Sequence, residues 1–172
     1  MNNEGVREPG RAAGLASTLA NVRRILFAVL LLAFVGTLVE LFLLGHDEDR
    51  WQIVPLVLLG AGTVSLAWTA IRPSAPAVRV FQVVMALFIA AGAIGLVQHY
   101  RANMEFQLEM DPSLRAMALF WKVMAAKAPP ALAPAIMAQL GVIGMAYAYR
   151  HPAQAPAVMS EHEEGEREDA IR

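Results

Sequence analysis

The amino-acid sequence predicts an all-α integral membrane protein: a four-transmembrane-helix bundle with an extra amphipathic helix between spans three and four. The first reason is composition, because 57% of the residues are hydrophobic and only 17% are charged, whereas soluble domains carry about 25% charged residues. The second reason is that four apolar runs reach or approach a length of about 20 residues, which a helix needs to cross a bilayer. Disordered chains are poor in apolar residues, so the same composition argues against disorder over most of the length.

The four predicted spans contain a single charged residue, Glu40. They cover residues of about 25–44, 53–71, 80–97 and 131–149. The alternative is a soluble helical bundle, but its helices would need polar stripes, which these runs lack. The first run is too long for the apolar part of a signal peptide, so we interpret it as an uncleaved anchor. The fourth run is the weakest, since it contains Pro134 and Gln139.

Basic residues at the ends of the runs predict the orientation of the chain. On one side of the four runs they are Arg23, Arg24, Arg72, Arg79 and Arg150. On the other side they are Arg50 and Arg101. Because cytoplasmic flanks carry the excess of Lys and Arg, we expect a multi-pass protein of the cell (inner) membrane with both termini in the cytoplasm.

The sequence divides into a membrane domain and two tails. Residues 1–20 are expected to form a disordered or weakly helical N-terminus, and residues 21–150 the four-helix domain. Residues 151–172 contain two prolines and the acidic stretch EHEEGERED, which is typical of a solvated, disordered tail.

Residues 98–130 form the only external segment long enough to have its own structure. Its first part continues the third span as a helix, which should end at Asp111 because the residue before a proline avoids the α region. Asp111 could then be the N-cap of the amphipathic helix, with Pro112 at its first position. The apolar stripe of this helix contains Leu114, Met117, Trp121 and Met124. It favours a helix lying at the membrane surface; the alternatives are a lid over a cavity and a docking surface for another membrane subunit.

Polar residues gather at the predicted outer face, and they form our candidate ligand-binding site. They are Glu40, His46, Gln52, His99, Asn103 and Glu105. Glu40 should have a partner or face water, because a carboxylate at that depth is costly. Imidazole and carboxylate ligands suit a divalent metal, so His46, His99 and Glu40 are the candidate metal ligands. The alternative is that all six are ordinary polar residues at the level of the lipid headgroups.

Three functions remain open after composition has excluded others. The chain has no cysteine, which excludes iron–sulfur and thiolate sites, and its net charge of −1 gives no basic surface for nucleic acid. The leading hypothesis is a non-enzymatic accessory or structural subunit, with the bilayer, another membrane subunit or a second copy as partner. The alternative is a metal- or small-ligand-binding protein for transport or sensing. A membrane enzyme with His99 or Glu40 as general base is the third, but no nucleophile accompanies them.

Overall fold

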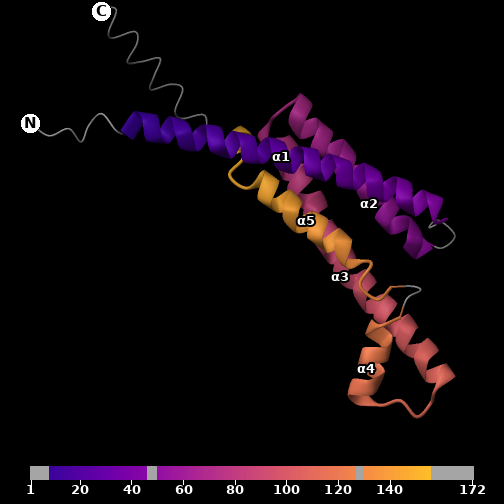
Figure 1. The fold of residues 1–172 in the computed structure, drawn as a ribbon. Coiled ribbons are helices and arrows are strands. Elements are labelled where there is room, and N and C mark those ends of the chain that lie inside the picture. Colours follow the sequence, from indigo (N-terminus) through magenta and orange to yellow (C-terminus); the bar gives the residue numbers. More distant parts are fainter. Residues whose placement is uncertain (1–7, 46–49, 127–129, 156–172) are drawn as a thin grey trace, which may run out of the picture.

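The chain is organised as a series of helices. The computed structural model describes residues 8–45, 50–126 and 130–155. These form α1 (Glu8–Leu43), α2 (Arg50–Ile71), α3 (Ala75–Met110), α4 (Ala116–Met124), α5 (Ala135–Ala148) and the short 3-10 helix η1 (Pro152–Gln154). Four of them, α1, α2, α3 and α5, pack together as a bundle, and the end of α3 carries α4 beyond it (Figure 1). Every element in the described ranges is helical, so the all-α prediction is confirmed.

Three helices are long and apolar enough to cross a membrane: residues 13–43 of α1, the whole of α2 and the whole of α3. The fourth predicted span, 131–149, is helical only from Ala135 to Ala148. At 1.5 Å per residue this helix is about 21 Å long, which is shorter than a bilayer core of about 30 Å. The chain turns at residues 131–134 and Pro134 occupies the N-cap of α5. The described residues therefore contain three spans, and a four-span bundle is not confirmed.

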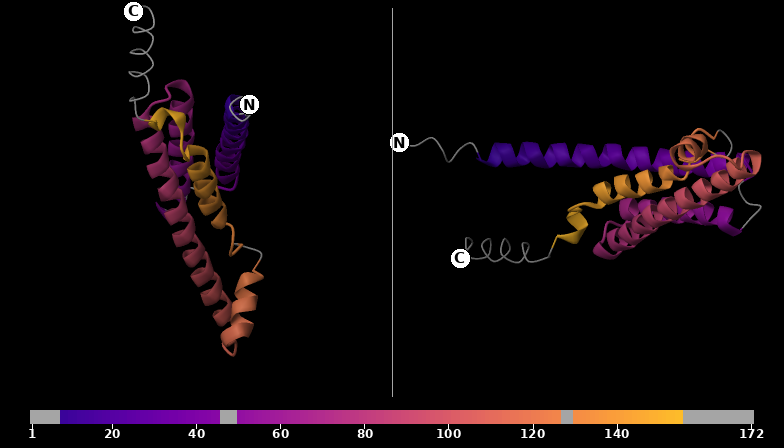
Figure 2. Two further views of the ribbon diagram at one scale, coloured as in Figure 1. Left: turned by 90° about the vertical axis from the view of Figure 1, so that its left-hand side faces the viewer. Right: turned by 90° about the horizontal axis from the view of Figure 1, so that it is seen from below.

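The predicted domain boundary at residue 20 is not a break in the structure. Residues 8–20 belong to the same continuous helix as the first span, and this part of α1 extends past the other helices (Figure 2). At the other end of the chain, residues 152–154 form η1, where the sequence predicted the start of a disordered tail. The side-chain Nε2 of Gln154 donates to Gln82 Oε1 over 3.1 Å and connects η1 to α3. Residues 1–7 and 156–172 lie outside the described residues, so the disorder expected there stays a prediction.

The hairpin between α3 and α4 differs from the prediction in one detail. α3 ends at Met110, as the proline at position 112 predicted. Asp111, however, is not the N-cap of α4: its Oδ1 accepts bonds from the backbone N–H of Ser113 over 3.1 Å and from the Ser113 hydroxyl over 2.6 Å. These bonds form a tight turn after α3. α4 consequently begins three residues after Ser113, with Arg115 at its N-cap position.

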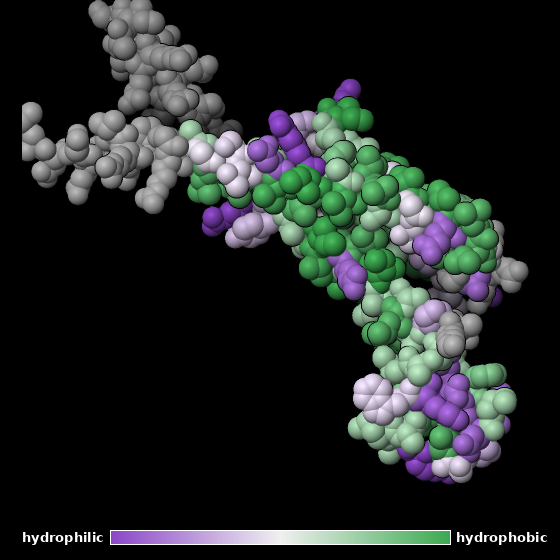
Figure 3. Space-filling view, viewed as in Figure 1, coloured by the Kyte–Doolittle hydropathy of each residue, from purple (hydrophilic) through white to green (hydrophobic). Residues whose placement is uncertain are grey.

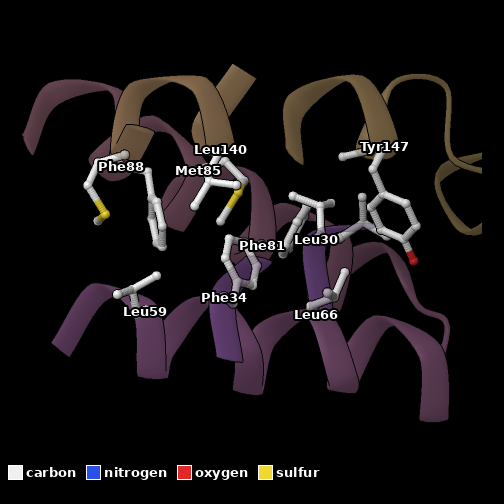
Figure 4. Close-up of a cluster of buried hydrophobic side chains, with 12 residues drawn as sticks. Leu30, Phe34, Leu59, Leu66, Phe81, Met85, Phe88, Leu140 and Tyr147 are labelled. Atoms are coloured by element: carbon white, nitrogen blue, oxygen red, sulfur yellow. The ribbon is translucent and has the colours of Figure 1, made fainter. Parts of the chain in front are cut away.

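The apolar core lies where the four bundle helices meet. Large side chains of α1, α2 and α3, among them Phe34, Leu59, Phe81 and Phe88, are fully buried there (Figure 4). The rings of Phe34 and Phe88 lie 5.2 Å apart in a tilted arrangement, which is within the favourable range for aromatic pairs. Hydrophobic surface covers the outside of the bundle as well, and hydrophilic side chains gather mainly toward its ends (Figure 3). A chain with apolar residues both inside and outside is what a membrane requires.

Glycines allow α3 and α5 to pack closely. A Cβ atom added to Gly92 of α3 would lie 2.5 Å from the backbone nitrogen of Ala138, and one added to Gly141 of α5 would lie 2.6 Å from Ile89. Both distances are too short for any other residue. This is the close approach that small residues permit between membrane helices. Gly95 of α3 lies against Pro134 at the start of α5, and Met85 near the start of α3 lies against Gly144 near the end of α5. The two helices therefore run antiparallel.

Candidate functional site

A cavity of about 620 Å³ lies between α1, α2, α3 and the start of α5. Pockets that bind small molecules have about this size, apolar walls and a few polar groups. Among the residues that the structure describes, no Asp, Glu, Lys or Arg side chain lines this cavity. Its polar side chains are Thr37, Trp51, Gln52, Gln98 and His99. Its remaining walls are Leu41, Val54, Pro55, Leu58, Leu87, Ala90, Ala91, Ile94, Gly95, Ala133, Pro134, Ile136 and Met137.

The space in the cavity arises from the small side chains of α3. Ala90, Ala91 and Gly95 follow one another on the wall that α3 contributes, and an alanine or glycine fills little volume. Pro134 stands against Gly95, where a Cβ atom would lie 2.8 Å from the proline ring. The small residues therefore serve two purposes: they let the start of α5 approach α3, and they leave room beside the contact.

His99 joins α3 to the segment that leads into α5. Its Nδ1 lies 3.1 Å from the carbonyl oxygen of Pro130. A carbonyl oxygen can only accept, so Nδ1 is the donor of this bond. A neutral imidazole that donates from Nδ1 has Nε2 as its hydrogen-bond acceptor. The half-buried ring thus has a fixed orientation and can offer an acceptor to a ligand.

The structure brings together two of the six residues predicted for the ligand-binding site. Gln52 and His99 both line the cavity, and Gln52 already takes part in another interaction. Asn103 is buried one turn further along α3, where it also has a partner. Glu40 and Glu105 are exposed and do not line this cavity, and His46 lies outside the described residues. Three polar lining residues, Thr37, Trp51 and Gln98, were not among the six predicted. Of these, Gln98 could have been predicted because it directly precedes His99 in the sequence.

The structure describes two of the three predicted metal ligands, Glu40 and His99. Among the described residues, no three His, Cys, Asp or Glu side chains are close enough together to hold a metal ion. Because His46 is not among these residues, the metal site stays a prediction. The described lining of the cavity offers one imidazole and two amides, which is a weak ligand set for a divalent cation.

A second polar cluster, which sequence analysis missed, lies at the opposite end of the bundle. Arg23 of α1 donates from Nε to the carbonyl of Tyr147 and from Nη2 to the carbonyls of Tyr149 and Arg150, each over 3.3 Å. These carbonyls belong to the C-terminal end of α5, where a cation is favourable. The Tyr147 hydroxyl lies 3.0 Å from that of Thr69 on α2. The cluster therefore fastens the end of α5 to two other helices.

His151 completes this second cluster. Its Nδ1 accepts the backbone N–H of Ala153 over 3.3 Å at the start of η1, and its ring lies 5.8 Å from that of Tyr147. Burial lowers the pKa of the His151 imidazole below its ordinary value, and the positive charge of Arg23 lowers it further. The neutral form, which keeps Nδ1 as an acceptor, is therefore the form that suits the folded chain.

No family model matches the chain, and no curated protein or solved structure shows significant similarity to it. The class of protein follows from the fold alone. It is an all-helical chain with three helices long and apolar enough to cross a membrane, which indicates a membrane protein.

Proposed function

We propose that the chain crosses the cell membrane four times, with α5 as the fourth crossing and both termini in the cytoplasm. Two observations support this topology. α5 runs antiparallel to the apolar part of α3, from Gly95 back to the level of Met85 and Phe81, so the two helices occupy the same depth. The turns that flank α5 add length to its 14 helical residues.

The charges of the described residues support the orientation. Five arginines lie at the end of the bundle where α5 finishes: Arg23, Arg24, Arg72, Arg79 and Arg150. The described carboxylates other than Glu8 belong to the opposite half: Glu40, Glu105, Glu109 and Asp111. By the positive-inside rule the arginine end faces the cytoplasm. The 620 Å³ cavity then opens toward the outer half of the membrane.

We further propose that the protein binds a neutral amphiphile from the lipid phase in this cavity, without catalysing a reaction. The observation that carries the proposal is the described lining, which consists of apolar walls with amide, hydroxyl, indole and imidazole groups and, within the described ranges 8–45, 50–126 and 130–155, no charged side chain. A ligand with an alcohol, ester or ketone head and an apolar body matches this distribution. Its head would meet Nε2 of His99 and the amide of Gln98, and its body would lie against Leu87, Ile94 and Met137.

Photolabelling of the purified full-length protein tests this function. The probe is a monoacylglycerol with a diazirine in its acyl chain and a terminal alkyne. Ala90→Trp fills the cavity, and Ala93→Trp adds the same bulk at an exposed position of α3 that does not line it. We expect labels on the cavity-lining peptides of α3 and α5, several-fold less labelling of Ala90→Trp, and unchanged labelling of Ala93→Trp. Equal labelling of the two variants, or labels spread over all exposed apolar faces, would contradict the proposal.

The α3–α4 hairpin supports a second role, that of an accessory subunit. It projects beyond the bundle (Figure 1), and Met117 and Trp121 of α4 are 65% and 63% exposed. Exposed apolar and aromatic side chains of this kind are typical anchors of an interface. A photoreactive amino acid in place of Trp121 should crosslink to one constant membrane protein in native membranes, and the same substitution at Lys122 should not. Adducts with lipid alone would rule out this role.

A further inference from the structure

A second groove, of about 370 Å³, lies at the arginine end of the bundle, where α1 leaves the other helices. Its lining residues come from three helices: Ala20, Arg23, Arg24 and Phe27 from α1, Ala70 from α2 and Tyr147 from α5. Two cations therefore stand beside two aromatic rings and two alanines. We propose that this groove binds the headgroup of an anionic phospholipid, with the phosphodiester at the arginines and an acyl chain along Phe27 and Ala70.

The geometry of Arg23 makes it suitable for a fixed contact. Its hydrogen bonds to the end of α5 use Nε and Nη2. Within the described part of the chain, its Nη1 can therefore still donate hydrogen bonds to a ligand. A guanidinium group has five N–H donors in a planar fork, which matches the geometry of phosphate oxygens. The end of α5 thus holds Arg23 in place before any lipid arrives, and the neighbouring Arg24 is exposed.

The depth and the surroundings of the groove match a headgroup. Arg23 and Arg24 immediately precede the apolar run that begins at Ile25, so they lie where hydrocarbon gives way to water. Among the α1 residues whose side chains the structure describes, Glu40 is the one carboxylate, and it lies sixteen residues after Arg24. No described carboxylate of α1 therefore competes for these arginines. Basic pockets between transmembrane helices on the cytoplasmic side are typical binding sites for anionic lipids.

This inference does not depend on what occupies the 620 Å³ cavity, and the two sites are tested separately. The assay is binding of phosphatidylglycerol to the full-length protein in neutral detergent, measured as bound lipid by native mass spectrometry, with phosphatidylcholine in parallel. Arg24→Gln should weaken phosphatidylglycerol binding about fivefold, the effect of one cation near a membrane surface. Ala70→Trp, which keeps every charge and fills the groove, should weaken it as well. Arg79→Gln removes an exposed charge from the same end outside the groove and should leave binding unchanged.

Three results would overturn the proposal. The first is binding by Arg24→Gln equal to that of the unsubstituted chain. The second is an equal loss with Arg79→Gln, which would show a general attraction to positive charge in place of a built site. The third is a loss of lipid specificity. Equal retention of phosphatidylcholine would show that the negative charge of the headgroup contributes nothing, and full displacement of phosphatidylglycerol by millimolar inorganic phosphate would show that the lipid body contributes nothing.

Discussion

The hydroxyl groups of Tyr147 and Thr69 lie 3.0 Å apart and connect α5 to α2. The Thr69 hydroxyl also lies 2.7 Å from the carbonyl of Leu66, to which it donates, so the tyrosine donates to the threonine. Both residues are buried. Together they form a direct side-chain bond between the short helix and a helix that is long enough to cross the membrane.

Removal of this bond should cost little, and the two substitutions should not add. Tyr147→Phe and Thr69→Val should each lower the free energy of unfolding by about 0.5–1.5 kcal/mol. The free energy of unfolding of the double variant should fall about as much as that of one single variant, because the first substitution already removes the bond. Unfolding in mixed micelles of dodecyl maltoside and dodecyl sulfate measures these values. Strict additivity would show that the two hydroxyls do not interact.

The contact between α3 and α5 should be intolerant of a single methyl group. Gly92→Ala would place a Cβ 2.5 Å from the backbone of Ala138, and overpacking of this kind costs about 1–3 kcal/mol. Gly36→Ala is the matched control, since nothing lies within 4 Å of its added Cβ. Alanine is the better helix former by about 1 kcal/mol, so Gly36→Ala should leave stability unchanged or raise it. A Gly92→Ala variant as stable as Gly36→Ala would mean that the helices do not approach as described.

Loss of Arg23 should release the end of α5. Arg23→Gln removes the cation and its bonds to three carbonyls, which we expect to cost about 1–2 kcal/mol because these groups are partly exposed. Arg79→Gln at the same end should change stability by less than about 0.5 kcal/mol. Unfolding of both variants in detergent free of anionic lipid separates this structural role from lipid binding. Equal stability of the two variants would remove Arg23 as the cap of α5.

Acid should destabilise the C-terminal end of the bundle through His151. Its folded-state pKa is lowered by burial and by Arg23, so the unfolded chain binds the proton more readily than the folded chain. The contribution of His151 is thus fully present above about pH 6.5, the ordinary imidazole value, and is lost as the pH falls through the lower folded-state pKa. His151→Gln should flatten the stability profile in this window. A profile with the same slope in the variant would assign the acid sensitivity to another group.

The parts of the fold that depend on composition and periodicity were predictable, and the parts that depend on packing were not. Three apolar runs became the three long helices, because a run without polar stripes has no other stable conformation in lipid. The proline after Asp111 correctly predicted the end of α3. The predicted start of α4 was wrong, since the Asp111 carboxylate accepts two hydrogen bonds from Ser113 just after α3 and does not cap α4. Hydropathy alone could not show that Pro134 would delay the start of α5.

The region of the candidate site was predicted from the sequence, but most of its lining residues were not. The end of the bundle that includes Glu40 and His99 was expected to contain the polar functional residues, and Gln52 and His99 do line a cavity at that end. Glu40 was favoured because a lone carboxylate in an apolar run is conspicuous, yet its side chain is exposed and lines no part of the cavity. The contribution of Thr37, and the bonds from Arg23 to the end of α5, depend on helix rotation and on contacts across more than a hundred residues. Local sequence patterns predict neither of them.

Both binding proposals rest on four membrane crossings, and the sidedness of Ala155 tests that claim most directly. The chain has no cysteine, so a single introduced cysteine reports one position without background. A membrane-impermeant maleimide should label Glu109→Cys in intact cells, and should label Ala13→Cys and Ala155→Cys only after permeabilisation. Labelling of Ala155→Cys in intact cells, together with Glu109→Cys, would show that α5 does not cross the membrane and would contradict the account.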